Sequence, residues 1–162
     1  MHYLMLISLF LLLNSYNPDL YVTIQLSGND FVYIDPIPEL NLSPGERENI
    51  DVSFKIKEGY HIQANKVLDD NLIPSSITTQ SPEEIKVENP VFPVPLEFHL
   101  KNVKEAMLVF HNTLRINLPV NISENTKDGI FVISGNLHYQ ACDSVKCYFP
   151  RDLPFEIRVN VK

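Results

Sequence analysis

Positive charge is scarce in this sequence. Its 162 residues include 13 lysines and arginines against 20 aspartates and glutamates, which gives a formal net charge of -7 at pH 7. Binding to the phosphate backbone of a nucleic acid requires a concentrated basic surface, and the chain contains no cluster of five or more basic residues. The composition therefore argues against nucleic acid as a partner.

Long hydrophobic runs are also lacking. The most apolar stretch is LMLISLFLLL at residues 4–13, ten residues that are too few to cross a bilayer comfortably. This length is typical of the hydrophobic region of a secretory signal peptide, so we predict a signal peptide at residues 1–18 and a single domain at residues 19–162. Because MHY has no lysine or arginine and no clear cleavage site follows, a membrane anchor or a buried first strand is the alternative. Export would place the chain where disulfides persist.

Glycine and tryptophan are rare, with five glycines and no tryptophan, whereas proline occurs 12 times. Apolar and polar residues alternate in PFEIRVNVK (154–162), RINLPVNI (115–122) and DVSFKIK (51–57), as they do in strands with one buried face. Turn sequences such as LSPGE, KEGY and NTKDG separate these runs. About seven such strands predict an all-β protein, an immunoglobulin-like sandwich of two antiparallel sheets. Only SPEEIKVE (81–88) could form a helical turn.

Cysteine occurs only twice, as Cys142 and Cys147 in HYQACDSVKCYFP at residues 138–150. Strand patterns on both sides predict a hairpin with the loop DSVK, whose closing residues have Cα atoms ~4.5–5.5 Å apart, within the range that a disulfide tolerates. A ring of about six residues removes only ~2 kcal/mol of unfolded-state entropy, so the bond would be a weak staple. From spacing alone, a structural staple and a redox pair are equally good interpretations.

Alternation along the first strand of this hairpin predicts which way Cys142 points. His138 and Gln140 share its face, whereas Tyr139 lies on the opposite, more apolar face. If that apolar face is buried, Cys142 points outward and is the sulfur that meets a partner, unless a bulge reverses the faces.

Other chemistry at the cysteines is less well supported. Lys146 would stabilise a neighbouring thiolate and Asp143 would oppose one, and no Cys-x-x-Cys motif of the thioredoxin type is present. A cysteine hydrolase would use one nucleophile with a dedicated base. A soft metal site is a minor alternative, since no histidine has ligand spacing to another, and we expect no metal. The histidines considered are His61, His99, His111 and His138.

The cysteine segment carries a family resemblance. YQACDSVKCYFP (139–150) closely resembles the active-site hairpin of the N-terminal periplasmic domain of the thiol:disulfide interchange protein DsbD. FVYIDPIPEL (31–40) with FKIKEGYHIQANK (54–66), and LRINLPVNI (114–122), resemble strands of that domain in matching order. The resemblance extends over residues 30–161, and the cysteine hairpin is its most specific part.

The resemblance implies an immunoglobulin-like electron carrier in the periplasm of a Gram-negative-type bacterium. Cys142 and Cys147 would be its redox pair, exchanging through mixed disulfides with thioredoxin-fold proteins such as disulfide isomerases or cytochrome c maturation proteins. A separate thioredoxin-like or membrane reductant would reduce the pair again, without any cofactor, so the protein would be a disulfide reductase or interchange component. Residues expected near the site are Tyr60, His61, Gln63, His138, Tyr139, Gln140, Asp143, Lys146, Tyr148 and Pro150.

Two features differ from the family pattern. His61 and Gln63 follow the Gly-Tyr corner where the family has aromatic side chains, and the stretch expected to cap the cysteines, residues 102–108, lacks the family's phenylalanine. Candidate cap residues are Glu105, Met107 and Leu108, of which Met107 or Leu108 would replace the missing apolar lid.

Two broader alternatives remain open at this point. Since the sequence contains neither a membrane domain nor a thioredoxin-like domain, it is expected to be either a stand-alone carrier or a fragment. The competing functional hypothesis is a non-catalytic, secreted β-sandwich that serves as a binding or scaffold module and has an inert hairpin disulfide.

Overall fold

The computed structural model of the protein describes residues 31–101 and 104–162, which form strands and turns. The predicted signal peptide at residues 1–18 lies outside them. Segment 81–88 forms a turn closed by the Ile85 N–H, which donates to the Pro82 carbonyl at 3.0 Å, and continues as a strand rather than a helical turn. Nowhere in residues 31–101 and 104–162 is there a helix with the length and hydropathy that a bilayer crossing requires. The strands are β1 (Val32–Ile34), β2 (Leu40–Leu42), β3 (Arg47–Ile56), β4 (His61–Gln63), β5 (Ser76–Gln80), β6 (Ile85–Val87), β7 (Leu96–His99), β8 (Ala106–His111), β9 (Thr113–Ile122), β10 (Gly129–Tyr139), β11 (Ala141–Cys142) and β12 (Arg151–Val161).

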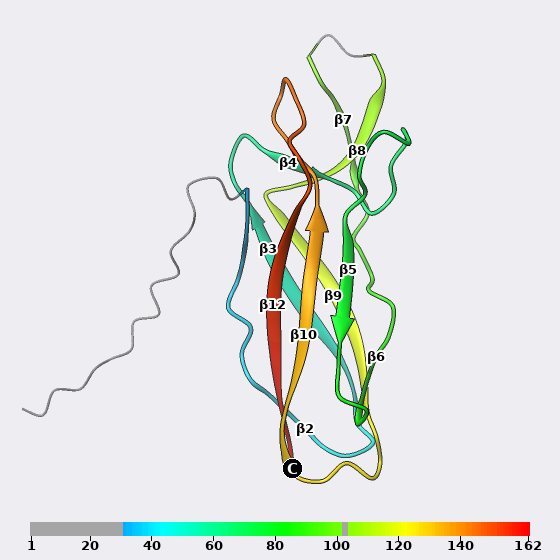
Figure 1. Ribbon diagram of the computed structural model, residues 1–162, viewed down its shortest axis with the longest axis vertical. Coiled ribbons are helices and arrows are strands. Elements are labelled where there is room, and N and C mark those ends of the chain that lie inside the picture. Colours follow the sequence, from blue (N-terminus) through cyan, green and yellow to red (C-terminus); the bar gives the residue numbers. More distant parts are fainter. Residues whose placement is uncertain (1–30, 102–103) are drawn as a thin grey trace, which may run out of the picture.

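Two sheets face each other and form the sandwich (Figure 1). One has the strand order β1-β3-β9-β6 and the other β2-β12-β10-β5. Their pairs are antiparallel apart from β2, which lies parallel to β12. The rings of Phe54 on β3 and Phe155 on β12 meet edge to face between the sheets, with centroids 5.7 Å apart. The predicted all-β, immunoglobulin-like sandwich is therefore confirmed.

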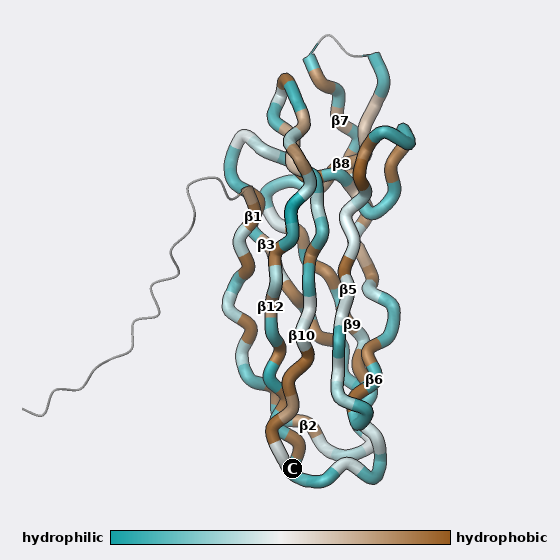
Figure 2. The backbone as a smooth tube through the Cα atoms, viewed as in Figure 1, coloured by the Kyte–Doolittle hydropathy of each residue, from teal (hydrophilic) through white to brown (hydrophobic). Residues whose placement is uncertain are grey.

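Alternating buried side chains build the core between these sheets, and Figure 2 colours the strands by the hydropathy of their residues. Every second residue of β9 is buried, and β3 and β12 follow the same rule over most of their length. Each fully buried aliphatic or aromatic side chain contributes about 1.5–3 kcal/mol relative to its exposed state. On β9 the buried residues are Leu114, Ile116, Leu118, Val120 and Ile122.

A third sheet lies at one end of the sandwich, near the top of Figure 1, and the two-sheet prediction did not include it. Its order is β11-β4-β8-β7. Strand β10 pairs with β12 as far as Tyr139 and Arg151, after which the chain leaves that sheet. The next strand, β11, pairs instead with β4, so that Cys142 lies opposite His61. The cysteine segment thus forms the end of the β10–β12 hairpin and joins the third sheet through β11.

Gly135 on β10 allows Phe155 to pack across the strand pair, and its substitution tests this packing. A Cβ atom at Gly135 would overlap the ring of Phe155, its cross-strand partner. We expect Gly135→Ala to lower the free energy of unfolding by about 1–3 kcal/mol, because the buried ring must move. Urea denaturation measures the change. Gly129→Ala is the matched control, since its nearest contact would be an ordinary 3.6 Å to Phe131. Equal midpoints for the two variants would contradict this account.

Candidate functional site

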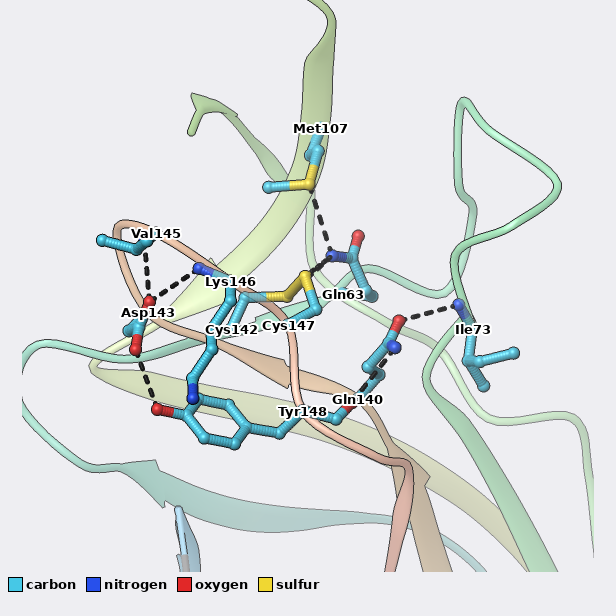
Figure 3. Close-up of a disulfide and its surroundings, with 10 residues drawn as sticks. All are labelled: Gln63, Ile73, Met107, Gln140, Cys142, Asp143, Val145, Lys146, Cys147 and Tyr148. Atoms are coloured by element: carbon cyan, nitrogen blue, oxygen red, sulfur yellow. Dashed lines mark hydrogen bonds between the residues drawn. A yellow bond between two sulfur atoms is a disulfide. The ribbon is translucent and has the colours of Figure 1, made fainter. Parts of the chain in front are cut away.

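Cys142 and Cys147 form a disulfide in the orange hairpin near the top of Figure 1, and Figure 3 shows its surroundings. Their Cα atoms lie 3.9 Å apart, somewhat closer than expected, and the two residues form an antiparallel bridge. The bridge closes the loop of residues 143–146. The sequence-based prediction of a hairpin whose ends can bond is therefore confirmed.

Asp143 organises this loop. Its Oδ1 accepts hydrogen bonds from the backbone N–H groups of Val145 at 2.7 Å and Lys146 at 2.8 Å, and its Oδ2 accepts one from the Tyr148 hydroxyl at 2.8 Å. The backbone N–H groups of Lys146 and Val145, followed by the Tyr148 hydroxyl, lower the pKa of Asp143 below its usual value. The same bond to Asp143 is the main reason that the pKa of Tyr148 is raised to about 12. The carboxylate therefore stays charged and fixes the loop that presents Cys147.

The two sulfur-bearing residues differ in exposure. Cys142 is completely buried, at 0% exposure, whereas Cys147 is partly exposed. The prediction that Cys142 points outward is wrong. Ala141 is buried as the alternation of β10 predicts, but the face of Cys142 is covered as well, with the buried amide of Gln63 on β4 against Cys142 Sγ. Ala141 and Cys142 are both buried where β11 joins β4. A partner can therefore reach Cys147 directly and cannot reach Cys142.

Gln140 holds the chain in place where it passes from β10 to β11. Its Nε2 donates to the carbonyl of Tyr148 at 3.1 Å, and its Oε1 accepts from the N–H of Ile73 at 3.1 Å (Figure 3). The Gln140 carbonyl accepts the N–H of Gln63 at 3.0 Å. These bonds tie the residue between β10 and β11 to β4, to the segment that follows β4 and to the second half of the cysteine hairpin. The predicted site residue Gln140 thus positions the cysteine hairpin.

Gln63 lies beside the sulfurs and is itself completely buried. Its Nε2 lies 3.3 Å from Cys142 Sγ, 3.8 Å from Cys147 Sγ and 3.6 Å from Met107 Sδ. Figure 3 shows this amide nitrogen directed at the disulfide. Its Oε1, also buried, has no hydrogen-bond partner among the described residues.

The candidate cap residues take different positions on β8 and before it. Met107 is buried, and its sulfur approaches the same amide nitrogen as the disulfide does. Leu108 is partly buried and packs against the core. Glu105 is exposed and lines a surface depression with Leu68 and the residues 69–71 instead. Of the three, only Met107 meets the amide that contacts the sulfurs.

Sequence analysis missed Phe98 on β7, the strand that precedes the expected cap. Phe98 lies opposite Met107 in the β7–β8 pair, and its ring packs on the imidazole of His61 with centroids 4.1 Å apart. Farther along the same hairpin, the Lys101 N–H donates to the Ser144 carbonyl of the cysteine loop at 3.2 Å. The β7–β8 hairpin is thus tied to the cysteine loop, although no local sequence pattern linked the two segments.

An aromatic cluster supports the other side of the hairpin. Phe31 packs on Tyr148 and on Tyr60, with ring centroids 4.7 Å and 4.8 Å apart. The Arg151 guanidinium lies 4.6 Å from the centroid of the Phe31 ring, and Lys146 Nζ lies 5.0 Å from that of Tyr148. Tyr60 and Tyr148 were expected near the site, whereas Phe31 and Arg151 were not, since neither has a recognisable spacing to the cysteines.

The remaining predicted residues lie farther from the chemistry. His138 is on the outer face of β10, where its Nδ1 is 2.9 Å from Asp152 Oδ1. Tyr139 is buried at the end of β10, and Pro150 is exposed just before β12. In the described part of the chain, no group of three or more histidine, cysteine, aspartate or glutamate side chains is arranged to bind a metal.

His61 is a buried imidazole opposite Cys142, with 4% of its surface exposed. Burial lowers its pKa from 6.5 to about 4, with the nearby Asp143 opposing this shift and His111 adding to it. The imidazole is therefore neutral at neutral pH. Its Nε2 has no hydrogen-bond partner among the described residues.

The lowered pKa predicts a pH dependence of stability. Because the unfolded chain takes up this proton near pH 6.5 and the folded domain only near pH 4, stability due to neutral His61 is complete above pH 6.5 and decreases as the pH falls toward 4. We expect the urea midpoint to fall more between about pH 7 and about pH 4.5 in the wild type than in His61→Phe. Parallel midpoint curves for the two proteins would refute this.

Known proteins resemble this chain in sequence and in fold. Residues 29–157 match the family described as Thiol:disulfide interchange protein DsbD, N-terminal. No curated protein sequence matches the chain. The reduced N-terminal domain of Neisseria meningitidis DsbD is 21% identical, with 69% of this chain and 78% of that chain covered and a TM-score of 0.45.

Two further solved structures are similar. A complex between the N-terminal domains of DsbD and PilB from Neisseria meningitidis contains a chain that is 18% identical, with 82% of this chain and 87% of that chain covered and a TM-score of 0.44. The seventh ScaB type I cohesin of Pseudobacteroides cellulosolvens is 11% identical, with 82% and 92% covered and a TM-score of 0.50, a likeness of fold alone. The family match extends over most of the sequence and includes the cysteine hairpin, and on this ground the chain belongs to the family of DsbD N-terminal domains.

Proposed function

We propose that this domain carries reducing equivalents by thiol-disulfide exchange between its Cys142–Cys147 pair and thioredoxin-fold proteins. Family membership supports the chemistry. The observation that carries the proposal is the unequal exposure of the pair, with Cys147 partly exposed and Cys142 buried behind it. A bond that closes a loop of this size adds only ~2 kcal/mol to stability by the loop-entropy estimate, so stability alone is a weak reason for it.

The exposure defines the order of events. A partner thiolate attacks Cys147 Sγ, the bond to Cys142 Sγ breaks, and the electron pair leaves on Cys142 as a thiolate. The partner's second thiolate then attacks its own sulfur in the mixed disulfide and releases Cys147. The partner becomes oxidised and the domain reduced by two electrons. The same steps in reverse reduce a partner disulfide.

Exposed apolar side chains on both sides of Cys147 form the surface that a protein partner meets. Val145 in the loop is 70% exposed and Phe149 after it is 91% exposed. A shallow pocket of about 310 Å³ beside Phe149 is lined by Cys147, Tyr148 and Phe149, among others. A partner sulfur that reaches Cys147 must cover this surface, which is apolar as interface cores usually are.

Partners and location complete the proposal. The N-terminal domain of a Neisseria family member is known in complex with a domain of PilB. For this chain we infer periplasmic thioredoxin-fold partners of the disulfide isomerase or cytochrome c maturation type, and a separate thioredoxin-like or membrane reductant. Export is supported by the apolar run at residues 4–13, and by a disulfide that an oxidising compartment would maintain.

Trapping of mixed disulfides tests this proposal. In Cys142→Ser the resolving sulfur is absent, so Cys147 should accumulate a stable mixed disulfide with a thioredoxin-fold protein whose second cysteine is replaced by serine and whose remaining cysteine is activated as a mixed disulfide with thionitrobenzoate, the leaving group. Cys147→Ser, whose remaining sulfur is buried, should give at least about tenfold less. Non-reducing electrophoresis and mass spectrometry measure both adducts. Absence of an adduct with Cys142→Ser would favour the inert scaffold module, and equal adducts would contradict the proposed order of attack.

Phe149→Ala tests the docking surface. Removing a central aromatic contact commonly costs about 1–2 kcal/mol of binding, so we expect KM for reduction of a thioredoxin-fold protein to rise roughly tenfold. The rate of reduction by glutathione, which needs no such surface, should stay the same. Ile130→Ala is a matched control, because Ile130 is also exposed, at 58%, but lies at the start of β10, far from the hairpin (Figure 1). A normal KM for Phe149→Ala would rule out this surface.

A further inference from the structure

Gln63 makes an unusual set of contacts for a buried amide. In the described part of the chain, the side-chain acceptors of its Nε2 are all sulfur atoms: Cys142 Sγ at 3.3 Å, Met107 Sδ at 3.6 Å and Cys147 Sγ at 3.8 Å (Figure 3). Neutral sulfur is a weak hydrogen-bond acceptor. The amide oxygen has no partner among the described residues.

These contacts do not explain a buried glutamine by stability. An amide with one end on weak acceptors and the other end unpaired costs free energy compared with an apolar side chain of the same shape. The backbone of Gln63 is nevertheless firmly placed, since its carbonyl accepts the Ser75 hydroxyl at 2.5 Å and its N–H donates to the Gln140 carbonyl at 3.0 Å. The Gln63 side chain is thus held against the sulfurs, although its hydrogen bonds to the oxidised pair are weak.

Opening of the disulfide gives the Gln63 amide a charged acceptor. When a thiolate attacks Cys147, the negative charge appears on Cys142 Sγ, which is completely buried. A buried thiolate without a donor is strongly disfavoured. In the described part of the chain, Gln63 Nε2 is the one side-chain donor within hydrogen-bond distance of Cys142 Sγ. A charged acceptor roughly doubles the strength of a hydrogen bond.

We propose, on the basis of the exchange function above, that the Gln63 amide is a catalytic hydrogen-bond donor that stabilises the Cys142 thiolate as the Cys142–Cys147 bond breaks. In one direction the amide N–H receives charge on the leaving sulfur. In the reverse direction it keeps Cys142 as a thiolate, which attacks Cys147 Sγ in the mixed disulfide and expels the partner thiolate. The electron pair moves between sulfurs in both directions, and Gln63 transfers neither an electron nor a proton.

Other charged groups around the site do not replace this donor. His61 on β4 is opposite Cys142 and neutral at neutral pH, and His111 on β8 is opposite His61. In the loop, Asp143 is negative and accepts three hydrogen bonds, while Lys146 Nζ lies over the ring of Tyr148. Asp143 opposes a thiolate, which makes a neutral donor from β4 more important.

Gln63→Leu tests the proposal in the full-length domain. Without the donor, the pKa of the Cys142 thiol in the reduced protein should rise by about one unit, as measured from its ¹³Cβ chemical shift against pH. Reduction of the disulfide by glutathione should slow by about threefold to tenfold, because the leaving thiolate is less stable. If the wild type exchanges but Gln63→Leu leaves both the pKa and the rate unchanged, the role proposed for Gln63 is overturned and the exchange function is not.

Two further variants separate catalysis from structure. Ser75→Ala removes the buried hydrogen bond to the Gln63 carbonyl and leaves the amide in place, so it should lower the melting temperature without changing the pKa or the glutathione rate. Gln63→Glu places a repelling carboxylate at neutral pH, but a neutral O–H donor once that carboxyl is protonated. Its glutathione rate, divided by that of Gln63→Leu, should therefore rise as the pH falls.

The outcomes discriminate between the two levels of the account. A flat rate ratio across pH, or a Ser75→Ala variant that reproduces the effects of Gln63→Leu, would show that Gln63 acts only through structure and would overturn the inference. A wild-type disulfide that glutathione cannot reduce at all would overturn the exchange function, and this inference with it.

Discussion

The change of strand pairing at Gln140, between β10 and β11, is the constraint on which the site depends. Up to Tyr139 the chain follows β10 in the sandwich, and from Ala141 it pairs with β4 in the third sheet. The Gln140 amide bonds to Ile73 and Tyr148 keep the two directions in place. Because β11 pairs with β4, the third sheet covers Cys142, whereas Cys147 remains partly exposed. Cys142 therefore lies against the buried amide of Gln63 and not in solvent.

Most of the sandwich could be predicted from the sequence, because strands with one buried face produce a period of two, and β3, β9 and β12 show it clearly. The disulfide hairpin could be predicted as well, since its two cysteines enclose a short polar loop. The burial of Cys142 could not, because the face that alternation assigns to solvent is covered by β4, a strand far away in the sequence. Phe98 and Phe31 were missed for a similar reason, since only the folded sheets place them beside His61 and Tyr148.

The two cysteines have different tasks in this account. Cys147 is presented by a loop that Asp143 organises, between the exposed side chains of Val145 and Phe149. Cys142 receives or supplies the electron pair in a site that water and partners do not reach. At the positions where the sequence departs from the family's aromatic side chains, this chain has His61, a neutral imidazole packed on Phe98, and Gln63, an amide directed at sulfur. The departure from the family pattern thus lies at the buried sulfur, where the chemistry is most sensitive to a hydrogen-bond donor.

The central claim is that the Cys142–Cys147 bond takes part in thiol-disulfide exchange and is not an inert structural disulfide. Its reduction potential tests this most directly, by equilibrating the purified domain in glutathione buffers of graded ratio and counting free thiols by alkylation and mass spectrometry. The account predicts a potential above about -300 mV, with both thiols free in the more reducing buffers. A pair that stays oxidised in all of them, with a potential below about -300 mV, would contradict it, because such a bond is as resistant to reduction as a structural disulfide.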